Sequence, residues 1–265
     1  MKPIRILSLY SGSTGNSFLI QGPEGAILID AGKSAKRLCA SLCQAGISPD
    51  EISAIFVTHE HQDHISALPV FLKHHPIPVH LPAPSACRLE NEPWSERLLL
   101  PHPPIFTTEA AGMKVTSFPT PHDSRASVGY RIEINRDGRS PLSVGLATDI
   151  GYVTDTIHAA LLGCHAVILE SNHDVEMLRY GPYPYDLKQR ILSRRGHLSN
   201  EDSAIESARL AQGGTRAFLL AHLSLENNRP DVALDAHISS LGSEDVRLCV
   251  AHAEELTELV LEEEL

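Results

Sequence analysis

The hexapeptide His59-Glu60-His61-Gln62-Asp63-His64 directly follows the apolar run Ala54–Thr58, which predicts a buried β-strand. In the turn after a strand, the first two histidines point the same way and can bind one metal ion. The aspartate and the last histidine then face the other side. Imidazole and carboxylate groups are ligands suited to zinc, manganese or iron. Because burying four of them together in a plain loop is costly, the hexapeptide predicts a metal site rather than a solvated polar loop.

Three further candidate ligands stand at or just past the ends of predicted strands. One follows the strand expected at 113–118, one ends the run at 142–148, and one ends the run at 217–221. A lone histidine at a strand end is more often structural, but the three together complete a set for two divalent ions, zinc or manganese. The predicted ligands are His59, His61 and His122 for one ion, Asp63, His64 and His222 for the other, and Asp149 between them.

The order of the remaining elements predicts an α/β protein with two sheets, each covered by helices on its outer face. Residues 74–110 are rich in proline and are expected to form loops with one short helix around 85–90. The acidic tail that begins at Glu254 is expected to be a solvated helix face. The other expected strands are Ile4–Leu9, Ser17–Gln21, Ala26–Asp30, Val128–Ile134 and Ala166–Glu170, and the expected helices are Ser34–Ala45, a stretch ending near Lys73, Asn200–Ala211 and Pro230–Leu241.

Composition narrows the class of protein. The chain has 265 residues, 42% of them hydrophobic, and a formal net charge of −11, which argues against a protein that coats nucleic acid with a basic surface. No apolar run approaches the roughly 20 residues of a membrane span, and the first residues lead directly into a strand rather than a signal peptide. Five cysteines without zinc spacing suit a reducing, cytoplasmic location.

The chain resembles the metallo-β-lactamase superfamily of hydrolases, because Asp30 in Leu28-Ile29-Asp30-Ala31-Gly32, the hexapeptide and the three strand-end ligands follow the family's order. The resemblance implies an αββα sandwich of two mixed sheets with the metals at the strand ends. It gives Asp30 the role of orienting the site. The histidine at position 61, where the di-iron flavoproteins carry glutamate, speaks against redox chemistry. The short interval from Asp149 to His222 leaves no room for a large inserted domain, so residues 1–265 are expected to form a single domain.

A narrower resemblance, to the YycJ/WalJ proteins, extends over roughly residues 4–235. That group is regarded as DNA exonucleases acting from 5′ ends, related to the tRNA 3′-processing nucleases. The resemblance therefore implies a DNA 5′-to-3′ exonuclease. The segments that carry it are Ser11–Ser17, Pro121–Asp123, Thr148–Gly151, Glu170–Asp174, Arg195–Asn200 and His222–Asn228.

The expected catalytic residues are Asp63, Glu170 and His197. Two divalent ions would acidify a bridging water to hydroxide and neutralise charge on a phosphate or carbonyl oxygen. The leaving oxygen still needs a proton, and His197 held by Glu170 is the candidate donor, since a carboxylate fixes the tautomer and favours the imidazolium. The tRNA-processing relatives use a glutamate–histidine pair at the matching motifs. The alternative is that His197 only orders the turn before the helix at Asn200.

The expected substrate contacts are less specific. Residues 175–196 hold five basic and two acidic side chains interleaved with three tyrosines, and such residues follow phosphates and stack on exposed bases. The alternative is a solvated loop with the tyrosines packed beneath it. The glycine-rich turn at 11–16 offers backbone amides to a phosphate. The residues singled out are Ser13, Asn16, Arg194, Arg195 and Tyr183.

Three functions remain open on the sequence. The first is a phosphodiesterase that takes DNA as its partner, without a membrane. The second keeps the metals but hydrolyses a thioester, a lactone or a cyclic phosphodiester. The third is a metal-stabilised binding protein without turnover, which the complete ligand set disfavours. The sequence does not predict the oligomeric state.

Overall fold

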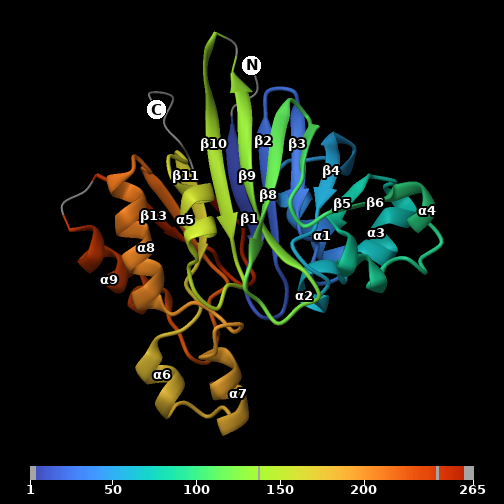
Figure 1. The fold of residues 1–265 in the computed structure, drawn as a ribbon. Helices are drawn as coiled ribbons and strands as arrows, with labels where there is room; N and C mark the ends of the chain where they lie inside the picture. Colours follow the sequence, from blue (N-terminus) through green and yellow to red (C-terminus); the bar gives the residue numbers. More distant parts are fainter. Residues whose placement is uncertain (1–3, 137, 243–244, 260–265) are drawn as a thin grey trace.

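The computed structural model describes residues 4–136, 138–242 and 245–259. Their strands form two mixed sheets of seven, which lie face to face (Figure 1). The first sheet has the order β14 (Thr257–Leu259), β1 (Arg5–Tyr10), β2 (Ser17–Gly22), β3 (Gly25–Ile29), β4 (Ile52–Phe56), β5 (Val79–Pro82) and β6 (Leu99–His102). The second has the order β13 (Arg247–Val250), β12 (Ala217–Ala221), β11 (Ala166–Glu170), β10 (Arg139–Ala147), β9 (Ser127–Arg136), β8 (Met113–Thr120) and β7 (Thr107–Ala110).

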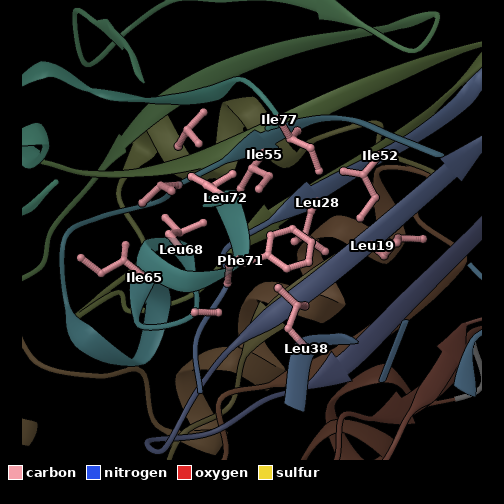
Figure 2. Close-up of a cluster of buried hydrophobic side chains, with 14 of the residues drawn as sticks. Leu19, Leu28, Leu38, Ile52, Ile55, Ile65, Leu68, Phe71, Leu72 and Ile77 are labelled. Atoms are coloured by element: carbon pink, nitrogen blue, oxygen red, sulfur yellow. The ribbon is translucent and has the colours of Figure 1, made fainter. Parts of the chain in front are cut away.

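Helices cover the outer face of each sheet, which confirms the predicted αββα sandwich (Figure 1). On the first sheet lie α1 (Ala35–Gln44) and α3 (Leu68–His74), whose apolar side chains pack with Leu19 and Leu28 (Figure 2). On the second sheet lie α5 (Asp155–Leu161), α8 (Asn200–Gln212) and α9 (Pro230–Leu241). The shorter helices are α2 (Gln62–Ile65), α4 (Ser95–Leu98), α6 (Val175–Tyr180), α7 (Tyr185–Ile191) and the 3₁₀ turns Pro49–Glu51 and Ala83–Arg88.

The continuous apolar runs of the strands follow from this four-layer arrangement. Successive residues of a strand point to opposite faces of its sheet. In β11, Ala166 and Ile168 enter the core between the sheets, while Val167 and Leu169 pack beneath the outer helices. Both faces are therefore buried, and a continuous apolar run is stable where an alternating one would place polar groups in a core.

Two expectations for local structure are wrong. Residues 74–110 contain β5, β6 and β7 and two short helical segments, Ala83–Arg88 and α4. β5 ends in a proline, β6 contains one and β7 is mostly polar, so none of them shows the apolar run of a central strand. The described part of the acidic tail is not a helix, because Thr257–Leu259 pairs with β1, where Glu258 forms an ion pair with Arg5 at 2.7 Å. Glu262–Glu264 lie outside the described residues.

The segment at 175–196 forms α6 and α7, a helical pair that projects from the sandwich (Figure 1). We call residues 175–196 the arm. Asp174, the residue before the arm, caps α6, because its side-chain oxygen accepts a hydrogen bond from the Met177 N–H at 2.7 Å. In the described ranges, no helix combines the length and apolar character that a membrane-spanning helix needs.

A buried histidine in α9 predicts a loss of stability in acid. Nδ1–H of His237 donates to the carbonyl of Ala233 at 2.8 Å, and its Nε2 lies 3.1 Å from the Ser203 hydroxyl, so the neutral ring is satisfied. Burial lowers the pKa of His237 to about 4 from the ordinary 6.5. The stability contributed by the neutral ring is present above pH 6.5 and is lost as the pH falls through 4, to an extent of about 3 kcal/mol.

The test is urea unfolding of the metal-free wild-type protein and the His237→Gln variant at several pH values between 7 and 4. The free energy of unfolding of the wild-type protein should fall more steeply with acid than that of the variant. Both proteins keep the same other titrating groups, so the difference isolates His237. Parallel pH dependences would contradict the prediction.

Candidate metal centre

The candidate ligands meet at the strand ends, where three of them adopt an unusual backbone conformation. Asp30 follows β3, Asp149 comes shortly after β10 and His222 follows β12, and their φ angles are 59°, 57° and 58°. Residues other than glycine seldom adopt this left-handed conformation. Such strain is concentrated at functional sites, where the surrounding contacts hold it. The backbone at these three positions directs the side chains toward the strand ends, where the candidate ligands meet.

The hexapeptide docks through its backbone against two loops, the turn between β1 and β2 and the loop after β3. The carbonyl of Asp63 accepts the N–H of Asn16, and the carbonyl of His64 accepts the N–H of Ala31, both at 2.7 Å. A Cβ on Gly32 would lie 1.9 Å from the Asp63 carbonyl oxygen, so only glycine permits this approach. These contacts fix α2 and with it the second half of the hexapeptide.

The structure brings all seven predicted ligands together in overlapping clusters whose ligand atoms lie within 4.8 Å of one another. Asp149 lies between the two halves, with Oδ2 at 3.3 Å from His64 Nε2 and Oδ1 at 3.9 Å from His122 Nε2. Three of the clusters are His59, His61 and His122; Asp63, His64 and His222; and His59, His64 and Asp149. The fourth is Asp149, Glu170, His197 and His222. The division of the ligands between two ions stays a prediction.

Four histidines point the same ring nitrogen inward. In each, Nδ1 contacts an acceptor that is not one of the seven predicted ligands, which leaves Nε2 as a metal ligand. Nε2 of His59, Nε2 of His222 and Oδ2 of Asp149 are buried and have no hydrogen-bond partner among the described residues. Buried lone pairs facing one another are costly unless a cation lies between them, so these residues fit divalent metals. The Nδ1 partners are Thr58 Oγ1 for His59, Asp30 Oδ2 for His64, the Gly196 carbonyl for His122 and Glu170 Oε1 for His222.

Asp30 orients the site without lying among the ligands. Its Oδ2 accepts Nδ1–H of His64 at 2.8 Å and the Thr58 hydroxyl at 2.9 Å, while Oδ1 accepts the Thr58 N–H at 2.8 Å. The Thr58 hydroxyl in turn lies 3.0 Å from Nδ1 of His59. One buried carboxylate therefore fixes the rings of two histidines, one from each half of the site.

Glu170 has a similar role on the second sheet. Its Oε1 accepts Nδ1–H of His197 at 2.8 Å and Nδ1–H of His222 at 2.9 Å, while Oε2 accepts backbone N–H groups of Ile150 and Leu198. The predicted pair of Glu170 and His197 is formed, and its extension to His222 was missed. His197 lies at the rim with 20% of its side chain exposed, so its Nε2 is the ring nitrogen left for a substrate.

Burial and charge perturb the titration of the cluster. Burial and the neighbouring rings of His64 and His122 lower the pKa of His59 well below its ordinary value. For His222, burial lowers the pKa, but the carboxylates of Asp149, Asp63 and Glu170 outweigh it and raise the pKa to about 10. Cation binding at Nε2 therefore has to displace a proton.

The predicted substrate residues lie in different surroundings. Asn16 is buried, with Nδ2 at 3.3 Å from His64 Nε2, so it contacts candidate ligands, whereas Ser13 is exposed. Arg194 is exposed and lies over the Tyr152 ring at 4.1 Å, and Arg195 donates to the His122 carbonyl. Tyr183 is half-buried between α6 and α7.

Two positioning contacts were missed by sequence reasoning. Glu60 is buried, where Oε1 accepts the Arg125 N–H at 2.8 Å and Oε2 accepts the Ser85 hydroxyl at 2.7 Å. It thereby ties the hexapeptide to the loop after His122. The Thr58 contacts described above are the second. Glu60 was inside the motif, but nothing in the sequence indicated its distant partners.

Comparison with known proteins identifies the family. The family model described as the metallo-beta-lactamase superfamily matches residues 10–184. The chain belongs to the metallo-beta-lactamase superfamily. Together with the ligand clusters, this makes it a metal-dependent hydrolase of the metallo-beta-lactamase fold.

The relatives place the chain in the YycJ/WalJ group of this superfamily. It is 38% identical over 229 residues to "Exodeoxyribonuclease YycJ" of Bacillus anthracis, covering 85% of this chain and 84% of the relative. It is 35% identical over 242 residues to "Exodeoxyribonuclease WalJ" of Streptococcus pneumoniae strain D39, covering 90% and 88%. The crystal structure of the metallo-beta-lactamase fold protein YhfI from Bacillus subtilis, at 17% identity, covers 98% of this chain and all of that chain with a TM-score of 0.72, which shows the shared fold.

Because Asp30 orients His64, we expect that replacing this carboxylate weakens metal binding. In Asp30→Asn, an amide group replaces a carboxylate that accepts three hydrogen bonds, so the ring of His64 loses its fixed orientation. Such changes cost about 10- to 100-fold in metal affinity. Competition of the variant with a chelating dye for Zn²⁺ should show this loss. An unchanged affinity would mean that Asp30 serves only the backbone at Thr58.

Proposed function

We propose that this chain is a dinuclear metal-dependent exodeoxyribonuclease that degrades one DNA strand from its 5′ end. The observation that supports it most is that two ligand clusters share Asp149, and that one of them contains the pair of Glu170 and His197. The relatives named as exodeoxyribonucleases, at 35–38% identity over most of the chain, support DNA as the substrate.

The chemistry divides between the cations and the protein. When bound, two divalent ions, zinc or manganese, supply an acidified water as nucleophile and neutralise negative charge on the phosphate. The protein fixes the rings from both sheets, because Asp30 after β3 holds His64 and Glu170 at the end of β11 holds His222. Asp63 and Asp149 compensate part of the positive charge. The ring orientations are thus set before the substrate arrives.

His197 assists the leaving group in this proposal. Glu170 accepts Nδ1–H of His197, so Nε2 is the atom that carries and donates a proton to the departing oxygen. The same carboxylate oxygen accepts Nδ1–H of His222, a predicted ligand. The proton donor and the metal site are therefore held in fixed relation by a single buried group.

The arm is the proposed support for the DNA strand. Tyr180 and Tyr185 are 83% and 73% exposed, so the alternative of tyrosines packed beneath a loop does not describe them. Exposed aromatic rings stack on bases, and the exposed guanidinium of Arg194, which lies over the Tyr152 ring, offers positive charge to a phosphate. Arg190 pairs with Asp123 at 2.6 Å, and Arg195 donates to the His122 carbonyl. These two basic residues therefore anchor the arm to the loop after β8.

The first experiment follows product length over time from duplex DNA labelled at one 5′ end, with added Mn²⁺. The metal-site variant Asp63→Ala is the control for contaminating nucleases. Immediate release of labelled mononucleotides or short oligonucleotides, absent in the variant, is the expected result. Absence of cleavage of duplex and single-stranded DNA by metal-loaded protein would contradict the proposal and favour the alternative of a small ester.

Other expectations stay predictions. These are the cytoplasmic location, the single domain formed by residues 1–265 and the native metal. The mass of the metal-loaded protein and its bound elements, measured by native mass spectrometry, would give the number and identity of the ions directly.

A further inference from the structure

A hollow in the described part of the chain adjoins the metal centre. It is a cavity of about 270 Å³ whose walls are mostly apolar, formed by Leu223, Leu225, Pro230, Ala251 and Ala253. Leu225 is 64% exposed although it is a large apolar side chain. None of these residues has a role in the chemistry proposed above. The cavity is therefore open to a group that the chemistry proposed above does not use.

The position of the cavity relates it to the site. β11, β12 and β13 run parallel, so their carboxyl ends meet at one edge of the sheet, where ligands of such sheets bind. His222 ends β12, and the wall residue Leu223 follows it, about 3.8 Å away between Cα atoms. Ser11 lines the cavity as well, and its hydroxyl oxygen accepts the His222 N–H at 2.8 Å. A group bound here lies beside the second half of the metal centre.

The chemistry of the walls suits a flat heterocycle. Apolar walls accept its faces, and Ser224 offers a polar edge, because its Oγ accepts the Asn227 N–H at 3.2 Å while its own proton has no acceptor in the described residues. Arg229 and His252 line the cavity with exposed, planar side chains, which are types that stack on unpaired bases.

We propose that this cavity binds one unpaired nucleobase of the DNA strand, belonging to a nucleotide that flanks the scissile phosphate. The inference rests on the proposed function, since it takes the phosphate at the metal centre to be part of a DNA chain. It adds a consequence for substrate choice. A base can enter the cavity only after leaving its pair, so a duplex end has to open before each cut.

The test is a scan of abasic sites through the first four nucleotides at the 5′ end of a single-stranded substrate. An abasic residue at one position should lower kcat/KM about 5- to 150-fold, the range expected when a stacked base is lost. Positions whose bases stack on the exposed tyrosines of the arm should lose activity as well, and the variants below separate the two effects. Loss at no position, with intact DNA still cleaved, would overturn the cavity proposal and leave the nuclease in place.

Two variants locate the effect. Ala253→Trp fills the cavity, and Leu225→Ala removes an exposed wall without touching the core. Both should lower kcat/KM on intact DNA and reduce the difference between intact and abasic substrates. Hydrolysis of bis(p-nitrophenyl) phosphate, which has no nucleobase, should be unchanged. A full abasic effect in both variants would overturn the proposal, whereas hydrolysis of this diester without any DNA cleavage would overturn the proposed function and the inference with it.

Discussion

Asp149→Asn should reduce phosphodiester hydrolysis by about a thousandfold or more, because it removes the one charge shared by both halves of the site. Each carboxylate oxygen faces a different half, with Oδ2 at 3.3 Å from His64 Nε2 and Oδ1 at 3.9 Å from His122 Nε2. An amide offers an oxygen to one half and an N–H₂ group to the other, which repels a cation. Loss of several kcal/mol of charge stabilisation corresponds to this factor.

Asparagine is the most suitable replacement for Asp149, because this position has a φ of 57°. Asparagine tolerates this left-handed backbone better than alanine does, so the variant should fold. Bound metal, measured by elemental analysis after gel filtration, should fall together with the rate. Asp155→Asn, the same change at an exposed carboxylate on α5, is the matched control. Activity within tenfold of wild type would exclude a shared ligand at Asp149.

The candidate ligands could be singled out from the sequence because each follows the end of an apolar run. Asp30 and His222 directly follow β3 and β12, and Asp149 comes shortly after β10. The parallel pairing of β10, β11 and β12 brings the ends at Asp149 and His222 to one edge of the second sheet. The hexapeptide holds its ligands within one turn, so no long-range contact has to be inferred. The family resemblance predicted that the two sheets pack face to face. The structure and the fold shared with other members of the superfamily confirm this arrangement.

The parts that could not be predicted depend on contacts between distant segments. Glu60 reaches Ser85 and the Arg125 amide, and Glu170 reaches His222 across two parallel strands. β14 pairs with β1 from the other end of the chain, where Glu258 meets Arg5, although the local composition suggested a helix. Short edge strands and ion pairs of this kind leave no periodic pattern in the sequence.

His197→Ala should separate two substrates whose leaving groups differ in the need for a proton. A departing DNA oxygen is a poor leaving group, so loss of the proton donor should lower the rate on DNA by about 10²- to 10⁴-fold. The p-nitrophenolate ion leaves without a proton, so hydrolysis of bis(p-nitrophenyl) phosphate should change little. A ring that only ordered the turn before α8 would instead affect both substrates equally.

A second histidine–glutamate pair provides the control for His197. His158 on α5 has Nδ1 at 2.6 Å from Glu206 Oε1 on α8, away from the predicted ligands. His158→Ala removes the same chemical group from a comparable hydrogen-bonded pair and should leave the ratio of the two rates at the wild-type value. The ratio in His197→Ala therefore reports proton donation rather than the loss of a buried contact. Equal losses on both substrates would remove His197 from the reaction and leave Glu170 as a positioning residue for His222 alone.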